Sequence, residues 1–318
     1  MHPALSVIFF TTLSGAGYGL LAWLGLSMAL FSLRGPPPGS LQDLQLAGLA
    51  LGLALSTIGL LCSLAHLGQP QRAWRAMSQW RTSWLSREGL LALLTPQPAL
   101  AIAAVLLWTR PDPAQAALLG GLGALLALLA LATVACTAMI YASLKPIPAW
   151  RHPLVVPVYL LFALSTGLGL LAVLMAWLLG GEAPATLLPV LALLGALSLA
   201  LKWWYWRGIR DAPLPATTGD AIGLPGRTAT VFERPHTEAN YITREMAFTL
   251  ARRHARTLRI LAAVALLGLP LLALGLSATG VAPPLAALGL AAAGGLLGAF
   301  VERWLFFAEA RHMVTLYY

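Results

Sequence analysis

The sequence has little charge and little sulfur. Only 10% of its 318 residues are charged, whereas soluble domains average about 25%. Its two cysteines, Cys62 and Cys136, lie inside apolar runs without CxxC spacing, so neither a disulfide framework nor a zinc site is expected. These deficits exclude the ordinary soluble classes and predict no metal site in this chain.

Apolar residues take the place of the missing charge. Hydrophobic residues make up 59% of the chain, and the mean hydropathy is +0.79. Eight apolar runs each have the roughly 20 residues that a helix needs to cross about 30 Å of hydrocarbon. We therefore predict an all-α integral membrane protein, a bundle of eight transmembrane helices that forms one domain over residues 1–318. The expected spans cover about 5–33, 41–65, 89–108, 114–144, 154–179, 187–206, 257–279 and 284–307.

Basic residues are distributed unevenly between the loops. Eight spans place both termini on one side of the membrane, and of the 20 lysines and arginines all but Arg34 and Arg110 lie on that side. The positive-inside rule then predicts cytoplasmic termini in the bacterial inner (cytoplasmic) membrane. Topology in a lipid bilayer accounts for the net charge of +9, so no nucleic-acid partner is expected. The longest polar segment, at about 207–256, is predicted to be a cytoplasmic loop whose second half is helical.

Small residues recur at a spacing that allows helices to approach closely. The small-xxx-small pattern predicts packing contacts within one bundle. Its members here are the pairs Gly15 and Gly19, Gly48 and Gly52, and Gly294 and Gly298.

A polar stretch, HLGQPQRAWRAMSQWRTSWLSRE at 66–88, separates the second and third runs. Read as an α-helix, it places Trp74, Met77 and Trp84 on one face and Arg72 and Arg75 on the other. This pattern predicts an amphipathic helix lying in the membrane interface. Tryptophans and arginines also gather at interfaces of membrane proteins without any redox role.

His66 and Glu88 stand at the two ends of this stretch. A quinone that gains or loses electrons also gains or loses protons, so its site needs hydrogen-bond donors and a titratable group. Histidine and glutamate supply both. Ser86 is expected to cap the third span, which would place Glu88 in the first helical turn. A single histidine at a helix end is also commonly a structural hydrogen-bonding residue.

Two further groups of charges lie towards the C-terminus. Arg252, Arg256 and Arg259 form a stripe at helical spacing that suits anionic lipid or an acidic partner surface. Glu302 and Glu309 share a helix face at the end of the eighth run. Ionisable groups at membrane depth tend to face the bundle interior and carry function, although Glu302 would equally serve to neutralise a neighbouring arginine.

Five long blocks of sequence carry a family resemblance. In order, HLGQPQRAWRA, WRTSWLSREG, YASLKPIPAWRHP, NYITREMAFTLARRHARTLR and ERWLFFAEARH resemble the dimethyl sulfoxide reductase membrane-anchor (DmsC-type) family over nearly the whole chain. The resemblance implies the anchor of a three-subunit molybdenum oxidoreductase, with an iron–sulfur (four-cluster ferredoxin-like) subunit and a molybdopterin catalytic subunit as partners. It also implies a quinone site, for ubiquinone or menaquinone, in which Glu88 transfers protons. The implied site residues are His66 and Glu88, with Arg72, Arg75, Arg81 and Trp84 as neighbours.

The opening MHPALSVIFFTT is similar to the sulfite dehydrogenase (SoeC-like) branch of this family, whose catalytic subunits stay in the cytoplasm. The predicted orientation agrees, so we expect sulfite oxidation rather than dimethyl sulfoxide reduction. None of the six histidines is expected at mid-span, so the chain should carry no haem, and no iron–sulfur cluster is expected either. Alone it would not act on the terminal substrate.

Two other classes of membrane protein share some of these features. A transporter would place ionisable residues near mid-bilayer on broken helices, and the sequence indicates neither. A purely structural anchor without a quinone site needs only spans and a docking surface, and that alternative stays open on sequence alone.

Overall fold

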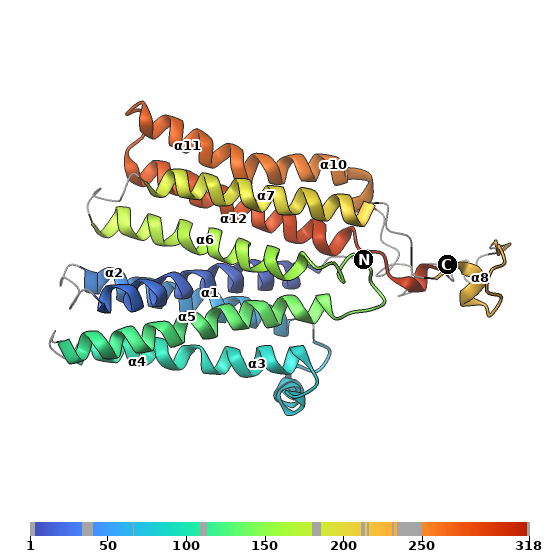
Figure 1. The fold of residues 1–318 in the computed structure, drawn as a ribbon, viewed down its shortest axis with the longest axis horizontal. Helices are drawn as coiled ribbons and strands as arrows, with labels where there is room; N and C mark the ends of the chain where they lie inside the picture. The colour runs from blue at the N-terminus through green and yellow to red at the C-terminus, as the bar shows by residue number, and fades with distance from the viewer. Residues whose placement is uncertain are drawn as a thin grey trace.

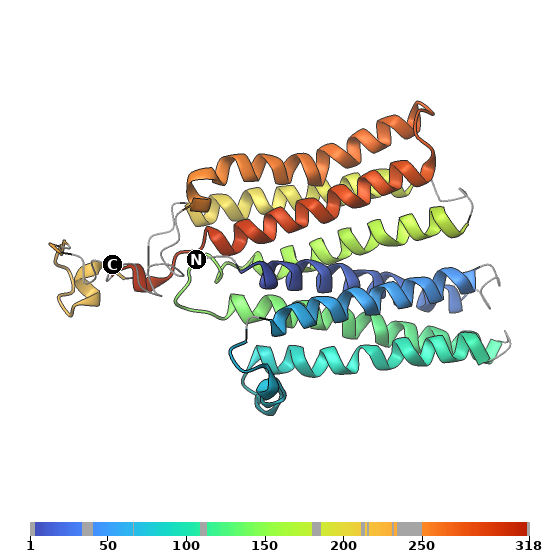
Figure 2. The same ribbon diagram turned by 180° about the vertical axis from the view of Figure 1, so that it is seen from behind.

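The computed structural model describes residues 4–33, 41–65, 67–108, 113–179, 186–210, 214, 216–230, 232–233 and 250–316. Within them eight helical stretches are long and apolar enough to cross a membrane, and no strand occurs. The predicted all-α fold with eight spans is therefore confirmed. The helices run side by side in one bundle, and the two ends of the chain lie at the same end of it (Figures 1 and 2). We refer to that end as the terminal side.

Six spans are single helices and two are interrupted. The single helices are α1 (Leu5–Ser32), α2 (Gln42–Leu64), α5 (Pro113–Ala142), α6 (Val155–Leu178), α7 (Leu187–Arg210) and α12 (Pro284–Ala308). The third span consists of α3 (Trp84–Leu94) and α4 (Pro96–Trp108), and the seventh of α10 (Leu250–Ala263), a π-helical turn η3 (Val264–Gly268) and α11 (Leu269–Ala278).

Prolines accompany both interruptions. Pro96 has no backbone N–H to donate to the preceding turn. α3 therefore ends at Leu94, with Thr95 as its C-cap. Pro270 follows the π turn of the seventh span. In that turn the backbone hydrogen bonds join residues five apart instead of four, which widens the helix locally. The expectation that no helix is broken is wrong at these two places.

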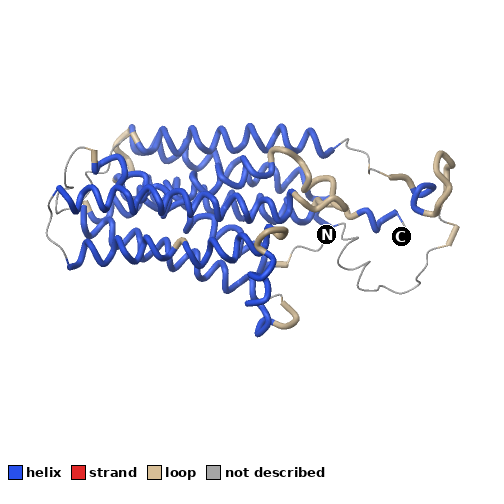
Figure 3. The backbone as a smooth tube through the Cα atoms, turned by 60° about the horizontal axis from the view of Figure 1, so that its bottom comes forward, coloured by secondary structure: helices blue, strands red, loops and turns tan. Residues whose placement is uncertain are grey.

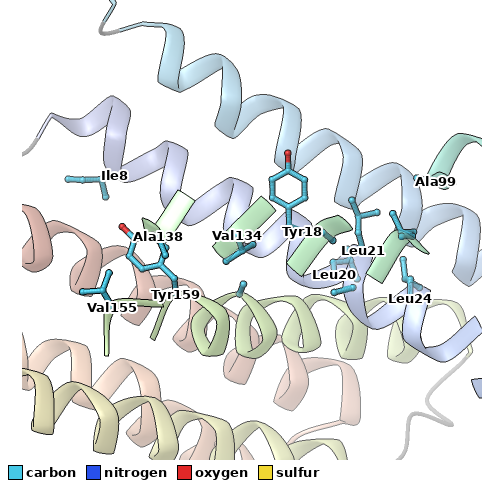
Figure 4. Close-up of a cluster of buried hydrophobic side chains, with 14 of the residues drawn as sticks. Ile8, Tyr18, Leu20, Leu21, Leu24, Ala99, Val134, Ala138, Val155 and Tyr159 are labelled. Carbon is cyan, nitrogen blue, oxygen red and sulfur yellow. The ribbon is translucent and has the colours of Figure 1, made fainter. Parts of the chain in front are cut away.

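The first span is the centre of the bundle. α1 packs against α2, α5, α6 and α12, and 67% of its most apolar window is buried, compared with 28% for α2. Glycines allow the close approach: Gly17 lies against the backbone of Gly52, and Gly19 against that of Ala163. Figure 4 shows the resulting core, with Tyr18 of α1 near Val134 of α5.

Five of the six predicted glycine contacts are present. Gly19, Gly48, Gly52, Gly294 and Gly298 all face another helix at distances that a Cβ atom would violate. Gly15 is the exception, because a Cβ there would meet nothing within 4 Å. In this part of α1 the close contacts are made by Gly17, against α2, and by Gly19, against α6.

The segment predicted as a polar loop at about 207–256 overlaps two helices. α7 continues to Arg210, and α10 begins at Leu250, within the half that was predicted to be helical. Between them the described residues contain one short helix, α8 (Thr218–Ala221), closed by a capping box between Thr217 and Asp220. Figure 3 shows these loops and the last helical turn η4 (Met313–Leu316) beyond the terminal end of the bundle.

Candidate functional site

The stretch before the third span forms a 3₁₀ helix, η2 (Pro70–Gln79), rather than the predicted α-helix. It lies beside α3 at the terminal end and runs across the bundle axis (Figure 1). The Ser86 hydroxyl donates to the carbonyl of Ala76, which ties η2 to α3. Three residues per turn place residues three apart in line. Arg72 and Arg75 thus form one row and Trp74 and Met77 the next.

The aromatic and basic residues of η2 face outward. Trp74 and Trp80 are 65% and 50% exposed. The guanidinium of Arg75 lies 5.6 Å from the ring of Trp74, and that of Arg81 lies 5.3 Å from Trp80. This exposed cation–π surface suits lipid headgroups or a partner protein. Arg72 is exposed as well, so the structure does not bring these arginines into a closed site.

Arg87 holds η2 against α3, a role that the sequence alone did not indicate. Its side chain donates to the carbonyls of Trp80 at 3.0 Å and Arg81 at 2.7 Å. Its guanidinium also lies 4.3 Å from the ring of Trp84. Among the residues predicted as neighbours of the site, Trp84 lies on the same helix as Glu88, one turn before it.

Ser83, not Ser86, caps α3. The Ser83 hydroxyl accepts from the backbone N–H of Ser86 at 3.4 Å, whereas the Ser86 hydroxyl is occupied by Ala76. The helix thus begins at Trp84, and Glu88 is its fifth residue rather than part of its first turn. The helix dipole therefore contributes less to the stability of a Glu88 anion than predicted, because its effect fades beyond the first turn.

Glu88 lies inside the bundle, 4% exposed, where α3 packs against α5. The Thr137 hydroxyl is hydrogen bonded to its Oε1 and also lies 3.1 Å from the carbonyl oxygen of Thr133. A hydroxyl has one proton and two lone pairs. It can donate to a Glu88 carboxylate, or it can donate to Thr133 and accept from a protonated Glu88, so Thr137 suits both protonation states.

The two oxygens of Glu88 differ in their contacts. Within the described part of the chain, Thr137 is the only hydrogen-bond partner of this carboxyl, and it binds Oε1. Oε2 is left without a partner there. His66 lies outside the described residues, so its predicted pairing with Glu88 stays a prediction.

A second buried polar site lies across the bundle, where α7 meets α12. Lys202 Nζ is 2.5 Å from Glu302 Oε1, and Arg303 Nη1 is 3.5 Å from Glu302 Oε2. The three side chains are only 1%, 0% and 2% exposed. Glu302 thus faces the interior and pairs with an arginine, and its predicted functional role stays a prediction. Lys202 was missed, although a single lysine in the apolar run LALKWWYW is a usable signal.

Aromatic rings surround the two cations. Lys202 Nζ is 3.7 Å from the ring of Tyr205, and the Arg303 guanidinium is 3.5 Å from that of Tyr159. A desolvated cation gains on the order of 2 kcal/mol from such a ring face. One carboxylate and two ring faces thus stabilise two buried positive charges.

A partly exposed ion pair lies beyond this cluster at the terminal end. Arg259 of α10 bonds to Glu309 at 2.8 Å. Burial raises the pKa of Glu309, and Arg259 and Lys202 oppose that rise. Of the stripe predicted to bind a partner, Arg259 is thus engaged within the chain and Arg256 is exposed. The side chain of Arg252 lies outside the described residues.

Comparison with known proteins agrees with this architecture. The family model described as DMSO reductase anchor subunit (DmsC) matches residues 1–308, which include all eight spans and both buried sites. A sulfite dehydrogenase subunit from Allochromatium vinosum is 34% identical over 331 residues, covering 100% of this chain and 99% of that protein. Similarity over this length shows that the chain is a multi-pass membrane protein and belongs to the DMSO reductase anchor subunit family, the membrane anchors of multi-subunit molybdoenzymes.

Proposed function

We propose that this chain is the quinone-reactive anchor of a sulfite dehydrogenase-like complex, passing electrons between the membrane quinone pool and an iron–sulfur subunit. The observation that carries the proposal is Glu88, a buried carboxyl with one oxygen free among the described residues. An uncompensated buried carboxyl is costly, and it is retained where a proton must be transferred.

Glu88 is at a suitable depth for a lipid-soluble substrate. It lies four residues inside α3, about 6 Å along the helix axis from the start of the span. A quinone that accepts two electrons takes up two protons at its carbonyl oxygens. Oε2 of Glu88 can give or take a proton there, while Thr137 adjusts its hydrogen bond on Oε1. His66 would donate a hydrogen bond to the opposite carbonyl.

The exposed basic surface of η2 and α10 supports docking of an acidic partner at the terminal side. Arg72, Arg75 and Arg81 are exposed on or beside η2, and Arg256 is exposed on α10. The charge distribution along the sequence supports a cytoplasmic location of this side. We infer that the iron–sulfur subunit binds here, with the molybdopterin subunit beyond it, because electrons must reach Glu88's end of the bundle.

Sulfite is the favoured terminal substrate. The matched relative is a sulfite dehydrogenase subunit, and the match extends over both chains almost completely. In that direction electrons flow from sulfite to quinone, and the anchor takes up protons at its quinone site.

The Glu88→Gln variant of the intact complex tests the proposal. Glutamine keeps the shape and a hydrogen bond to Thr137 but cannot titrate, so quinone-linked turnover should fall by about 10²-fold or more. Turnover with an artificial dye that oxidises the partner subunits directly should remain. Glu233→Gln, an exposed loop residue, is the matched control and should change neither activity.

A purely structural anchor predicts a different result. If Glu88→Gln keeps full quinone-linked turnover, the proton-transfer role is wrong, and the buried carboxyl serves packing only.

A further inference from the structure

A small cavity lies between the two buried polar sites. It has a volume of about 10 Å³, close to the roughly 10–15 Å³ that one water molecule needs. Thr137 of α5, which binds Glu88, forms part of its wall, and Arg303 of α12, which pairs with Glu302, forms another part. The cavity therefore touches one member of each site.

The wall is polar enough to hold water. Thr11 and Ser14 of α1 donate to carbonyls of their own helix at 2.9 Å and 2.6 Å, which leaves lone pairs on each hydroxyl to accept. Thr12 is 7% exposed, and its hydroxyl has no partner among the described residues. A buried hydroxyl without a partner is costly, and a water in the cavity would satisfy it.

Gly15 keeps this space open. It lines the cavity, and a Cβ atom at its position would meet nothing within 4 Å. The neighbouring glycines Gly17 and Gly19 instead pack directly against other helices. Gly15 therefore faces the cavity rather than another helix.

Two sets of contacts, separated by the cavity, lie between Glu88 and Lys202. The path passes from Glu88 to Thr137, across the cavity to Arg303, on to Glu302 at 3.5 Å and finally to Lys202 at 2.5 Å. Arginine does not lose its proton in proteins. Arg303 therefore holds water by its N–H groups, whereas the lysine, the carboxyls, the water and the threonine hydroxyl can each exchange a proton.

We propose that water in this cavity carries protons between Glu88 and the Lys202–Glu302 pair, so that the second buried site is a proton store for the first. The inference rests on the proposed function, because it assigns a source to the protons that Glu88 transfers. Its support is the cavity and the contacts at its two ends rather than either site alone.

The transfer is a chain of single proton steps. After Glu88 has given up its proton, its Oε1 takes one from the Thr137 hydroxyl, which takes one from the water. Lys202 passes its proton to Glu302, and the water, exchanging past the Arg303 guanidinium that lies between the cavity and Glu302, takes that proton. Each donor loses one O–H or N–H bond, each acceptor gains one, and no electrons move. The same steps in reverse carry a proton away from Glu88.

The store has a route towards the terminal surface. Glu309 follows Glu302 by two helical turns, about 10 Å along the axis, and it bonds to Arg259, whose side chain is 29% exposed. Other ionisable groups surround the path. Glu302 interacts electrostatically with Tyr159, Tyr205 and Glu309, and Glu88 with Tyr18, Cys136 and Tyr141.

The test compares four variants in the intact complex: Thr137→Val, Thr137→Ser, Glu302→Gln and Ser198→Ala. Thr137→Val and Glu302→Gln should each slow quinone-linked turnover by about tenfold or more, as removal of a proton-transfer group does, and should increase the H₂O/D₂O rate ratio. Dye-linked turnover and the affinity for a quinone-site inhibitor should stay unchanged. Thr137→Ser restores the hydroxyl and should restore turnover.

Ser198→Ala is the matched control, a buried hydroxyl one turn from Lys202 on α7 that does not line the cavity. It should leave turnover and the isotope ratio at their original values. If Glu302→Gln does not assemble, Thr137→Val alone decides the result.

Three outcomes overturn the inference. Unchanged turnover and isotope ratio in Thr137→Val, together with a loss in Glu88→Gln, would reject the proton store and leave the proposed function standing. Unchanged turnover in both Thr137→Val and Glu88→Gln would reject the proton store and the proposed function together. A loss of inhibitor affinity as large as the loss of turnover would mean that Thr137 only shapes the quinone site.

Discussion

Two buried glutamates lie near the terminal end of the bundle, and their neighbours differ. Glu88 has a neutral hydroxyl as its only described partner, whereas Glu302 has a lysine and an arginine. A hydroxyl can hydrogen bond to a carboxyl in either protonation state, whereas two cations can share their charge with the carboxyl between them. The same residue type therefore has a single neutral partner at one site and compensates buried positive charge at the other, because different helices face it.

The largest expected difference concerns stability. Glu302→Ala leaves Lys202 and Arg303 buried without their counter-ion, which should destabilise the protein by about 3–5 kcal/mol. Glu88→Ala should cost less, because Thr137 can still donate to Thr133. Thermal unfolding of both variants in the same detergent measures this order. Equal destabilisation would show that the two sites do not differ in the way their contacts indicate.

A smaller effect is expected at the outer pair. Arg259→Gln should destabilise the fold by on the order of 1 kcal/mol, because the pair is partly exposed. It should also raise the already elevated pKa of Glu309 further, because Arg259 opposes the effect of burial.

The sign of the pH dependence follows from that pKa. Between the ordinary value of 4.5 and the raised value, the folded state binds more protons at Glu309 than the unfolded state does. Stability should therefore fall as the pH rises through this range, and more steeply or further in Arg259→Gln. Unfolding temperatures measured from pH 4 upward check this, and Glu309→Gln should remove the dependence.

The smallest effect is a change in the titration of His152, which lies just before α6. Its Nδ1 accepts from the backbone N–H of Leu154 at 3.2 Å. Its pKa is lowered first by burial and then by the charge of Lys202. Lys202→Met should therefore raise the His152 pKa, and Glu88→Gln should not, which makes this ring a reporter of the second site alone. NMR titration of the histidine ring measures both.

Stability reports the same group. Because the folded pKa of His152 is lower than its ordinary 6.5, the folded state binds fewer protons. The contribution of His152 to stability is present above that value and is lost as the pH falls below it. His152→Asn keeps an acceptor for Leu154 without titrating, so it should weaken the acid dependence. An unaltered dependence would assign it to other groups.

Local patterns in the sequence predicted the spans well and the connections less well. The length of each apolar run is a property of neighbouring residues, so the number of spans and most of their ends agree with the structure. Ser86 was predicted to cap α3, but Ser83 is the cap and the Ser86 hydroxyl binds Ala76 of η2 instead, a contact that the sequence did not indicate.

The candidate site divides in the same way. Glu88 was predicted because it stands at the end of a polar stretch that carries the family resemblance, and Lys202 was missed although it interrupts an apolar run. Neither Thr137 nor the cavity was predicted, because a threonine within an apolar helix carries no signal of its own. Its importance arises from the residue on the other helix that it contacts.

The sequence by itself determined the class of protein, the number of spans and the polar residues that lie near a helix end, because hydrophobic length and helical period act locally. Only the tertiary structure decided which polar residues meet. Helical periodicity specifies which residues share a face, but the packing of α1 through its glycines decides which faces come together. Glu88 meets Thr137 across 49 positions of sequence, and Lys202 meets Glu302, because α5 and α12 are held around that central helix.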